Sequence, residues 1–137
     1  MTHPPYKILV VDDLEIVRAM VRASLGQLGY TGAEEAENGQ QAIDKIIAAQ
    51  NAGQPYDFIF CEWTLPVVSG IGVLNFCRTS EDFKETPFIM ITGELESAAV
   101  VKAIRAGATD YLVKPIALDI LERKLTKIVS RITGSAA

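Results

Sequence analysis

Four short apolar segments, each followed at once by a polar side chain, constrain the fold of this chain more than any other feature. They are Ile8–Val11, Phe58–Cys61, Phe88–Ile91 and Tyr111–Val113. Each has the length of a buried strand and is rich in β-branched and aromatic residues. Segments with helical periodicity separate them. This alternation predicts an α/β fold in which helices cover a parallel sheet.

Five segments with helical periodicity are expected, together with one further strand. The first helix follows Asp13 and should bury one stripe made of Leu14, Val17, Val21, Leu25 and Leu28. We expect the next three at about 40–49, 69–78 and 97–106, with Ser69 as an N-cap. The last helix should bury Leu118, Leu121, Leu125, Ile128 and Ile132. A weak strand at 31–36 carries Glu34 and Glu35, which suits a sheet edge.

The polar residues that follow the strands form a candidate site. Asp12 and Asp13 follow the first apolar segment, Glu62 the second, Thr92 the third and Lys114 the last. Parallel strands end at one edge of a sheet, where α/β proteins bind ligands. Two adjacent carboxylates repel each other in a cleft unless a cation neutralises them, and Mg²⁺ suits oxygen ligands. The alternatives are that Asp12 only caps the following helix and that Lys114 is a surface lysine.

Composition narrows the possible functions. With 137 residues, 49% of them hydrophobic, the chain can bury a core without staples. We expect one domain over residues 6–132, between tails at 1–5 and 133–137. The net charge of −4 argues against a nucleic-acid partner. No apolar stretch approaches the roughly 20 residues of a membrane span, and no signal-peptide core is present, so we expect a cytoplasmic protein without membrane insertion.

The histidine and cysteine content excludes several catalytic classes. His3 is the only histidine and lies in the expected N-terminal tail, which argues against Ser-His-Asp catalysis, Cys-His catalysis and a zinc site. Cys61 and Cys77 have no metal-binding spacing. We expect both to be buried free thiols of a protein in a reducing compartment.

Four motifs of the chain resemble, in order and spacing, the receiver domains of bacterial two-component response regulators. They are VVDD at Val10–Asp13, EWTLP at Glu62–Pro66, MITGE at Met90–Glu94 and YLVKP at Tyr111–Pro115. The resemblance covers about residues 6–132 and is greatest to the stand-alone, CheY-like type. It implies a flavodoxin-like, doubly wound sheet of five parallel strands in the order 2-1-3-4-5. It also implies a signalling protein and not an enzyme, with chemotaxis as the candidate pathway.

The resemblance assigns a metal site. Asp12 and Asp13 would be the acid pair, and Asp13 would bind Mg²⁺ directly with help from the Thr64 carbonyl. In the family, a histidine kinase donates a phosphoryl group to an aspartate at the end of the third strand. That acceptor position is Glu62 in this chain, which would also be the third carboxylate at the metal.

The resemblance also assigns the residues that contact the phosphoryl group or respond to it. Thr92 would be the switch hydroxyl, Tyr111 the switch aromatic residue and Lys114 the phosphoryl partner. The bond between Lys114 and Pro115 would be cis. Partners would be a histidine kinase, a downstream target, or both. The target would bind through the fourth helix, the fifth strand and the fifth helix.

Glu62 departs from the family pattern, which has aspartate there. One extra methylene moves the carboxylate by roughly 1.5 Å, and a misplacement of about 1 Å can slow a reaction on the order of a hundredfold. We therefore expect ordinary phosphorylation to be lost and Mg²⁺ binding to be weak. Three interpretations remain open. Glu62 holds an active-like state, or it holds an inactive state by pairing with Lys114, or it is an engineered change in a normal receiver.

Two other classes of protein share features of this sequence. Small Mg²⁺-dependent phosphatases with an aspartate nucleophile also place acids after the first strand, but they use Asp-x-Asp, and this chain has Asp12-Asp13-Leu14. Flavin carriers share the topology, but they need a phosphate loop where Asp12, Asp13 and Glu15 would repel a phosphate. A signalling receiver fits the sequence better than either.

Overall fold

Strands and helices alternate along the chain, as the apolar periodicity predicts. The structure, a computed structural model, describes residues 5–93 and 97–134. The strands are β1 (Ile8–Val11), β2 (Glu34–Ala36), β3 (Phe58–Glu62), β4 (Phe88–Thr92) and β5 (Asp110–Val113). The helices are α1 (Glu15–Gln27), α2 (Gly39–Asn51), α3 (Gly70–Arg78), α4 (Ser97–Arg105) and α5 (Leu118–Thr133).

The five strands form one parallel sheet in the order β2-β1-β3-β4-β5, which confirms the expected topology. β2 lies at the edge, as its two glutamates predict. It begins at Glu34 and not at Thr31, because Gly32 has a φ of 81°, which interrupts an extended strand.

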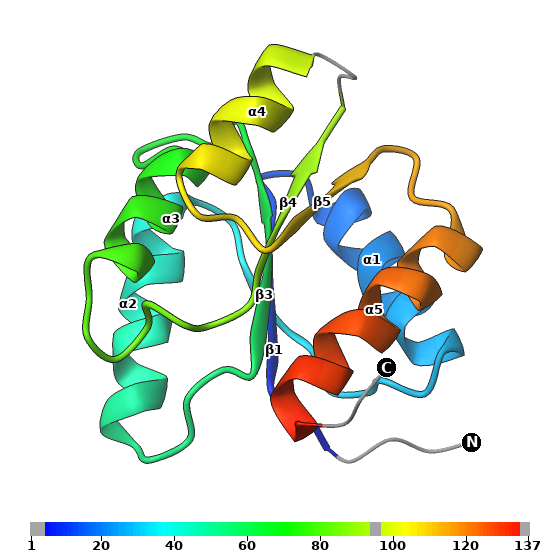
Figure 1. The fold of residues 1–137 in the computed structure, drawn as a ribbon, viewed down its shortest axis with the longest axis horizontal. Coiled ribbons are helices and arrows are strands. Elements are labelled where there is room, and N and C mark those ends of the chain that lie inside the picture. The colour runs from blue at the N-terminus through cyan, green and yellow to red at the C-terminus, as the bar shows by residue number, and fades with distance from the viewer. Residues whose placement is uncertain (1–4, 94–96, 135–137) are drawn as a thin grey trace.

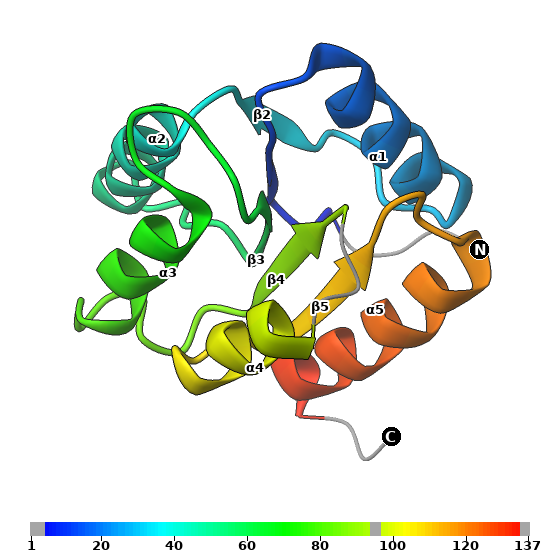
Figure 2. The same cartoon turned by 90° about the horizontal axis from the view of Figure 1, so that it is seen from above.

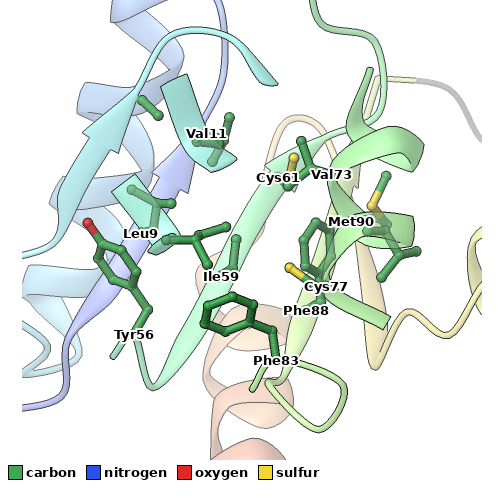
Figure 3. Close-up of a cluster of buried hydrophobic side chains, with 14 of the residues drawn as sticks. Leu9, Val11, Tyr56, Ile59, Cys61, Val73, Cys77, Phe83, Phe88 and Met90 are labelled. Carbon is green, nitrogen blue, oxygen red and sulfur yellow. The ribbon is translucent and has the colours of Figure 1, made fainter. Parts of the chain in front are cut away.

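Helices cover both faces of the sheet (Figures 1 and 2). α1 and α5 lie on one face, and α2, α3 and α4 lie on the other. Alternate residues of β1 serve the two faces: Leu9 and Val11 pack with the α2–α3 side, while Ile8 and Val10 pack with the α1–α5 side. Figure 3 shows the first of these clusters, in which the strand side chains meet those of α3. The core therefore consists of two layers that hold the strand ends in fixed positions.

The apolar residues that were expected to be buried on α1 and α5 are buried in the middle of each helix and more exposed toward its ends. Leu14 is 53% exposed, so its expected burial is wrong. It occupies the N-cap position of α1 with an extended backbone, which takes its side chain off the helical stripe. Leu118 and Ile132, at the two ends of α5, are also exposed. The residues between them that the stripe predicts, Leu121, Leu125 and Ile128, are buried.

Several local expectations are confirmed. The Ser69 hydroxyl caps α3 by accepting from the Gly72 amide at 3.2 Å. Cys61 and Cys77 are buried free thiols. Within the described parts of the chain, no helix is both long and apolar enough to cross a membrane. His3 and Glu94 lie outside the described residues.

Candidate functional site

The ammonium group of Lys114 lies between two carboxylates at the carboxyl edge of the sheet. Its Nζ donates to Oδ2 of Asp12 at 2.8 Å and to Oε1 of Glu62 at 2.7 Å. The Asp12 side chain is wholly buried, and those of Glu62 and Lys114 are 13% and 22% exposed. These short, charge-assisted contacts join residues that follow or end three different strands. We call Asp12, Glu62 and Lys114 the carboxylate–lysine triad.

Backbone hydrogen bonds beyond the strand ends hold the triad in place. The Lys114 amide donates to the Thr92 carbonyl at 2.8 Å, and the Asp12 amide donates to Ala36 at 3.1 Å. The amide that follows Glu62 donates to Ile91 at 2.9 Å. The bond between Lys114 and Pro115 is cis, as the resemblance implies. Each triad residue is therefore anchored to a neighbouring strand, so its position follows from the sheet.

The two acids keep Lys114 charged. Burial alone would lower the pKa of the Lys114 ammonium, but the hydrogen bonds to Asp12 and Glu62 outweigh this effect and raise that pKa above its usual value. Two carboxylates around one ammonium leave the triad with one net negative charge. Asp13 is exposed and adds a second negative charge near the same strand end. The site therefore has little positive charge left to attract an anion.

The second carboxylate oxygen of Glu62 is also occupied. Its Oε2 accepts a hydrogen bond from the Trp63 amide at 2.7 Å, so the side chain bends back toward its own backbone. With Oε1 on Lys114, each oxygen of Glu62 has a partner. Sequence reasoning missed this contact, because it depends on the side-chain rotamer and no motif signals it.

Asp12 contributes both to the triad and to the start of α1. Its Oδ1 accepts from the Leu14 amide at 2.9 Å, just before the helix begins. Its backbone carbonyl accepts from Nη1 of Arg18 at 2.7 Å, and Nε of the same guanidinium contacts Glu35 at 2.7 Å. Asp12 thus belongs to the triad and does not cap α1, because Leu14 occupies the N-cap position and no side chain caps the helix there. Sequence reasoning missed Arg18, although an arginine on the first helix opposite an edge-strand glutamate is a usable signal.

The residues that the resemblance assigns to magnesium supply only oxygen donors, which Mg²⁺ prefers. They are the carboxylates of Asp12, Asp13 and Glu62 and the carbonyl of Thr64. Within residues 5–93 and 97–134, no group of three or more Asp, Glu, His or Cys side chains is arranged to hold a metal. The oxygens of Asp12 and Glu62 accept hydrogen bonds from the chain itself. The donors have the right chemistry, and a metal ion would have to compete with Lys114 for them.

The two residues assigned to the switch lie at different depths. Thr92, at the end of β4, is buried and only 9% exposed. Tyr111 on β5 is half-buried, and Nζ of Lys124 lies 4.2 Å from its ring centroid. The same ammonium donates to Asp110 Oδ1 at 2.8 Å. Lys124 of α5 is therefore held against β5.

The loop between β3 and α3 packs tightly against its neighbours. A Cβ on Gly70 would lie 2.0 Å from the Glu62 carbonyl oxygen, and one on Gly39 would lie 1.9 Å from that of Val68. Only glycine fits at these two positions. Val67 has a φ of 69°, which is strained for a β-branched residue, and it is 78% exposed. The loop beside Glu62 thus combines close backbone packing with local strain.

Comparisons with known proteins agree with this geometry. The model of the response regulator receiver domain matches residues 8–126. The chemotaxis protein CheY of Pseudomonas aeruginosa is 33% identical over 128 residues, which cover 93% of this chain and 99% of that protein. CheY-3 of Vibrio cholerae is 34% identical over 126 residues, covering 92% of this chain and 93% of that protein.

Solved structures show the same fold. CheY4 of Vibrio cholerae has a TM-score of 0.76 and 30% identity, over 91% of this chain and 99% of that chain. The receiver domain of a sensor histidine kinase from Pseudomonas aeruginosa PAO1 has a TM-score of 0.78 and 28% identity, over 93% and 99%. That structure has a magnesium ion coordinated in its active site cleft. The chain therefore belongs to the response regulator receiver domain family of two-component signalling proteins.

Proposed function

We propose that this receiver signals through protein contacts from a single domain at about residues 6–132, and that ordinary phosphorylation of its acceptor position is lost. The observation that carries the proposal is the state of Glu62. One of its oxygens is bound by Lys114 and the other by the Trp63 amide. A carboxylate held in this way is a poor nucleophile toward a phosphoryl donor.

Charge and distance support the same conclusion. Phosphoryl transfer depends on positioning and on neutralising the charge of the transferred group. In a normal receiver, Lys114 and Thr92 would contact that group and Tyr111 would respond to it. Here two acids already neutralise the Lys114 ammonium. The carboxylate of Glu62 also sits roughly 1.5 Å further along its side chain than that of an aspartate.

For magnesium, we propose weak binding by Asp12, Asp13, Glu62 and the Thr64 carbonyl. Three carboxylates supply the charge that a divalent cation requires, and the related histidine kinase receiver coordinates magnesium in its cleft. Binding would have to displace the Lys114 ammonium from at least one carboxylate. This competition is why we expect a low affinity.

Protein partners fit the surface better than nucleic acid does. The net charge of −4 disfavours a phosphate backbone. Val101 and Ile104 on α4 and Ile120 on α5 are exposed apolar residues on the elements that we assign to a downstream target. A histidine kinase is the second candidate partner. Similarity to CheY proteins supports a chemotaxis role in the cytoplasm.

Catalytic turnover by a phosphatase with an aspartate nucleophile is disfavoured. Asp12, the candidate nucleophile, is completely buried. Its two oxygens accept from the Leu14 amide and from Lys114. A nucleophilic attack would need one of these oxygens freed from its hydrogen bond and brought out of the core, so we infer that the protein is not an enzyme.

The test is phosphorylation by a small donor. Acetyl phosphate and Mg²⁺ should leave the wild-type mass unchanged, whereas Glu62→Asp should gain about 80 Da for one phosphoryl group, because Asp12, Asp13, Thr92 and Lys114 supply the rest of a receiver site. Intact mass is measured under conditions that preserve acyl phosphates. Glu62→Gln, which cannot be phosphorylated, is the matched control. Rapid modification of the wild type would overturn the proposal.

A second measurement distinguishes the two natural interpretations of Glu62. Amide spectra of Glu62→Asp are recorded with and without beryllofluoride, an analogue of the phosphoryl group. A wild-type spectrum that resembles the beryllofluoride form means an active-like state. A spectrum that resembles the free form means an inactive state held by the Glu62–Lys114 pair.

A further inference from the structure

A cavity of about 310 Å³ lies at the amino edge of the sheet, the edge opposite to the carboxylate–lysine triad. Its lining residues come from the end of α3, the turn before β4, the turn before β5 and the end of α5. Its charged lining residues are Arg78, Lys84, Glu85 and Arg131. We call it the basic cavity. We propose that it binds the phosphate group of a small phosphate monoester.

Arg78 places a guanidinium at this cavity without an acidic partner. Its Nε donates to the Gly107 carbonyl at 2.8 Å and its Nη1 donates to the Phe83 carbonyl at 3.1 Å. Its Nη2 also donates to the Thr109 hydroxyl, at 3.5 Å. These acceptors are neutral, so they fix the side chain and leave its charge uncompensated. A guanidinium has five N–H donors, and those that these three neutral acceptors do not use remain for a ligand.

Like charges lie close together here. Burial lowers the pKa of the Arg78 guanidinium, and the nearby Arg131 lowers it further, while Glu85 acts in the opposite direction. Within the described residues, no acid is in ion-pair contact with Arg78 or Arg131. Lys84 pairs with Glu81 at 3.1 Å, but both side chains are well exposed and such pairs contribute little. The cavity is therefore positive within a protein whose net charge is negative.

The charge and the size of the cavity indicate the class of ligand. Three cations and one acid line the cavity, and a phosphate monoester carries about −1.5 to −2 charges near pH 7. Arginine binds phosphate oxygens with two parallel hydrogen bonds. Ligand cavities begin at about 300 Å³, so this one has room for a small organic group besides the phosphate. The simpler alternative is that Arg78 and Arg131 only complement the carboxyl ends of α3 and α5.

The experiment is an NMR titration of the ¹⁵N-labelled protein at constant ionic strength. The probes are inorganic phosphate, glycerol 3-phosphate as a simple monoester, and succinate as a dianion of different geometry. We expect saturable shifts of the Gly107, Ala108 and Thr109 amides with both phosphates, and tighter binding of the monoester. Equal saturation by succinate would overturn the assignment to phosphate. Shifts confined to the edge with Glu62 and Lys114 would overturn the assignment to this cavity.

Three variants make the test specific. Arg131→Gln should weaken binding on the order of fivefold, the effect of one charge at about 4 Å in water. Glu85→Gln should strengthen binding by a similar factor, and a gain of this kind cannot come from misfolding. Lys127→Gln removes a charge one turn earlier on α5, outside the basic cavity, and should leave affinity unchanged. Equal affinities in all three variants, or shifts that do not saturate, would show that the cations serve only the helix ends.

Discussion

The two edges of the sheet treat positive charge in opposite ways. At the carboxyl edge, Lys114 is held by two carboxylates at 2.8 and 2.7 Å. At the amino edge, Arg78 is held by neutral carbonyls, and Arg131 lies near it without an acid in ion-pair contact among the described residues. At the carboxyl edge the ion pairs neutralise the cation, whereas at the amino edge the positive charge of Arg78 and Arg131 is not neutralised by an ion pair within the described part of the chain. Family resemblance directs attention to the first edge, whereas the uncompensated charge lies at the second.

This difference has an energetic consequence. Removing a cation from a buried pair leaves a carboxylate without compensation, which is costly. Removing an exposed, unpaired cation leaves nothing uncompensated. Substitutions at the two edges should therefore differ in their effect on stability even when they remove the same charge.

The largest expected effect is that of Lys114→Met. It leaves the buried Asp12 facing Glu62 with no ammonium between them, so the free energy of unfolding should fall by about 3 kcal/mol. Arg131→Gln, the control at the other edge, should change it by less than about 0.5 kcal/mol. Urea unfolding measures both. Similar losses in the two variants would contradict the contrast between the edges.

The pH dependence sharpens this prediction. Because the folded pKa of Lys114 is raised, its contribution is present below the unfolded pKa of about 10.4 and is lost as the pH rises through the folded value. The difference in stability between wild type and Lys114→Met should be constant from pH 7 to about 9 and should shrink above about 10.4. A difference that persists unchanged at higher pH would mean that lost packing, and not charge, causes the effect.

A smaller effect is expected from Gly70→Ala. The new Cβ would lie 2.0 Å from the Glu62 carbonyl oxygen, a backbone atom that can move only with β3. We expect a loss of about 2 kcal/mol in urea unfolding. At the other edge, Gly107 has a φ of 104°, and a Cβ on it would meet only the flexible Arg78 side chain, at 3.0 Å. Gly107→Ala should therefore lower the free energy of unfolding by about 1 kcal/mol. A larger loss for Gly107→Ala would mean that the amino edge is the more rigid one.

The smallest effect is a gain in stability. Val67 holds a left-handed backbone that disfavours β-branched residues. Val67→Asn should raise the free energy of unfolding by about 1 kcal/mol, because asparagine adopts this conformation more easily. Val101→Asn, on an exposed helical position of α4, lacks this relief and is the control. A gain in both variants would point to lower surface hydrophobicity as the cause.

The sequence predicted the strands, the helices and their order along the chain, because the apolar periodicity reports burial directly. The sequence predicted the ends of these elements less well, because their ends depend on backbone geometry. Gly32, with its positive φ, shortens β2, and the extended backbone of Leu14 takes that residue out of the α1 stripe. These differences depend on local dihedral angles, which a pattern of apolar residues does not encode.

For the site, the sequence identified the residues but not their pairing. Asp12, Glu62 and Lys114 were expected at one edge because each lies at or just after the end of a strand. Their hydrogen bonds depend on side-chain reach, so the contact of Glu62 with the Trp63 amide could not be foreseen. The contact of Arg18 with Asp12 was missed although Glu35 on the edge strand offered a signal for it. The sequence did not predict the basic cavity for a related reason. Arg78 and Arg131 are far apart in sequence, and only the fold brings them together.

The two buried cysteines have a chemical consequence. Burial raises the pKa of the Cys61 thiol well above its usual value and raises that of Cys77 to about 11. Thiolates, which react with alkylating reagents, are therefore rare in the folded protein. Cys61 lies on β3 and Cys77 on α3, so a reagent reaches them only when the layer between sheet and helix separates. The rate of their alkylation therefore reports how often the packing between β3 and α3 opens spontaneously, and no probe has to be added to the protein.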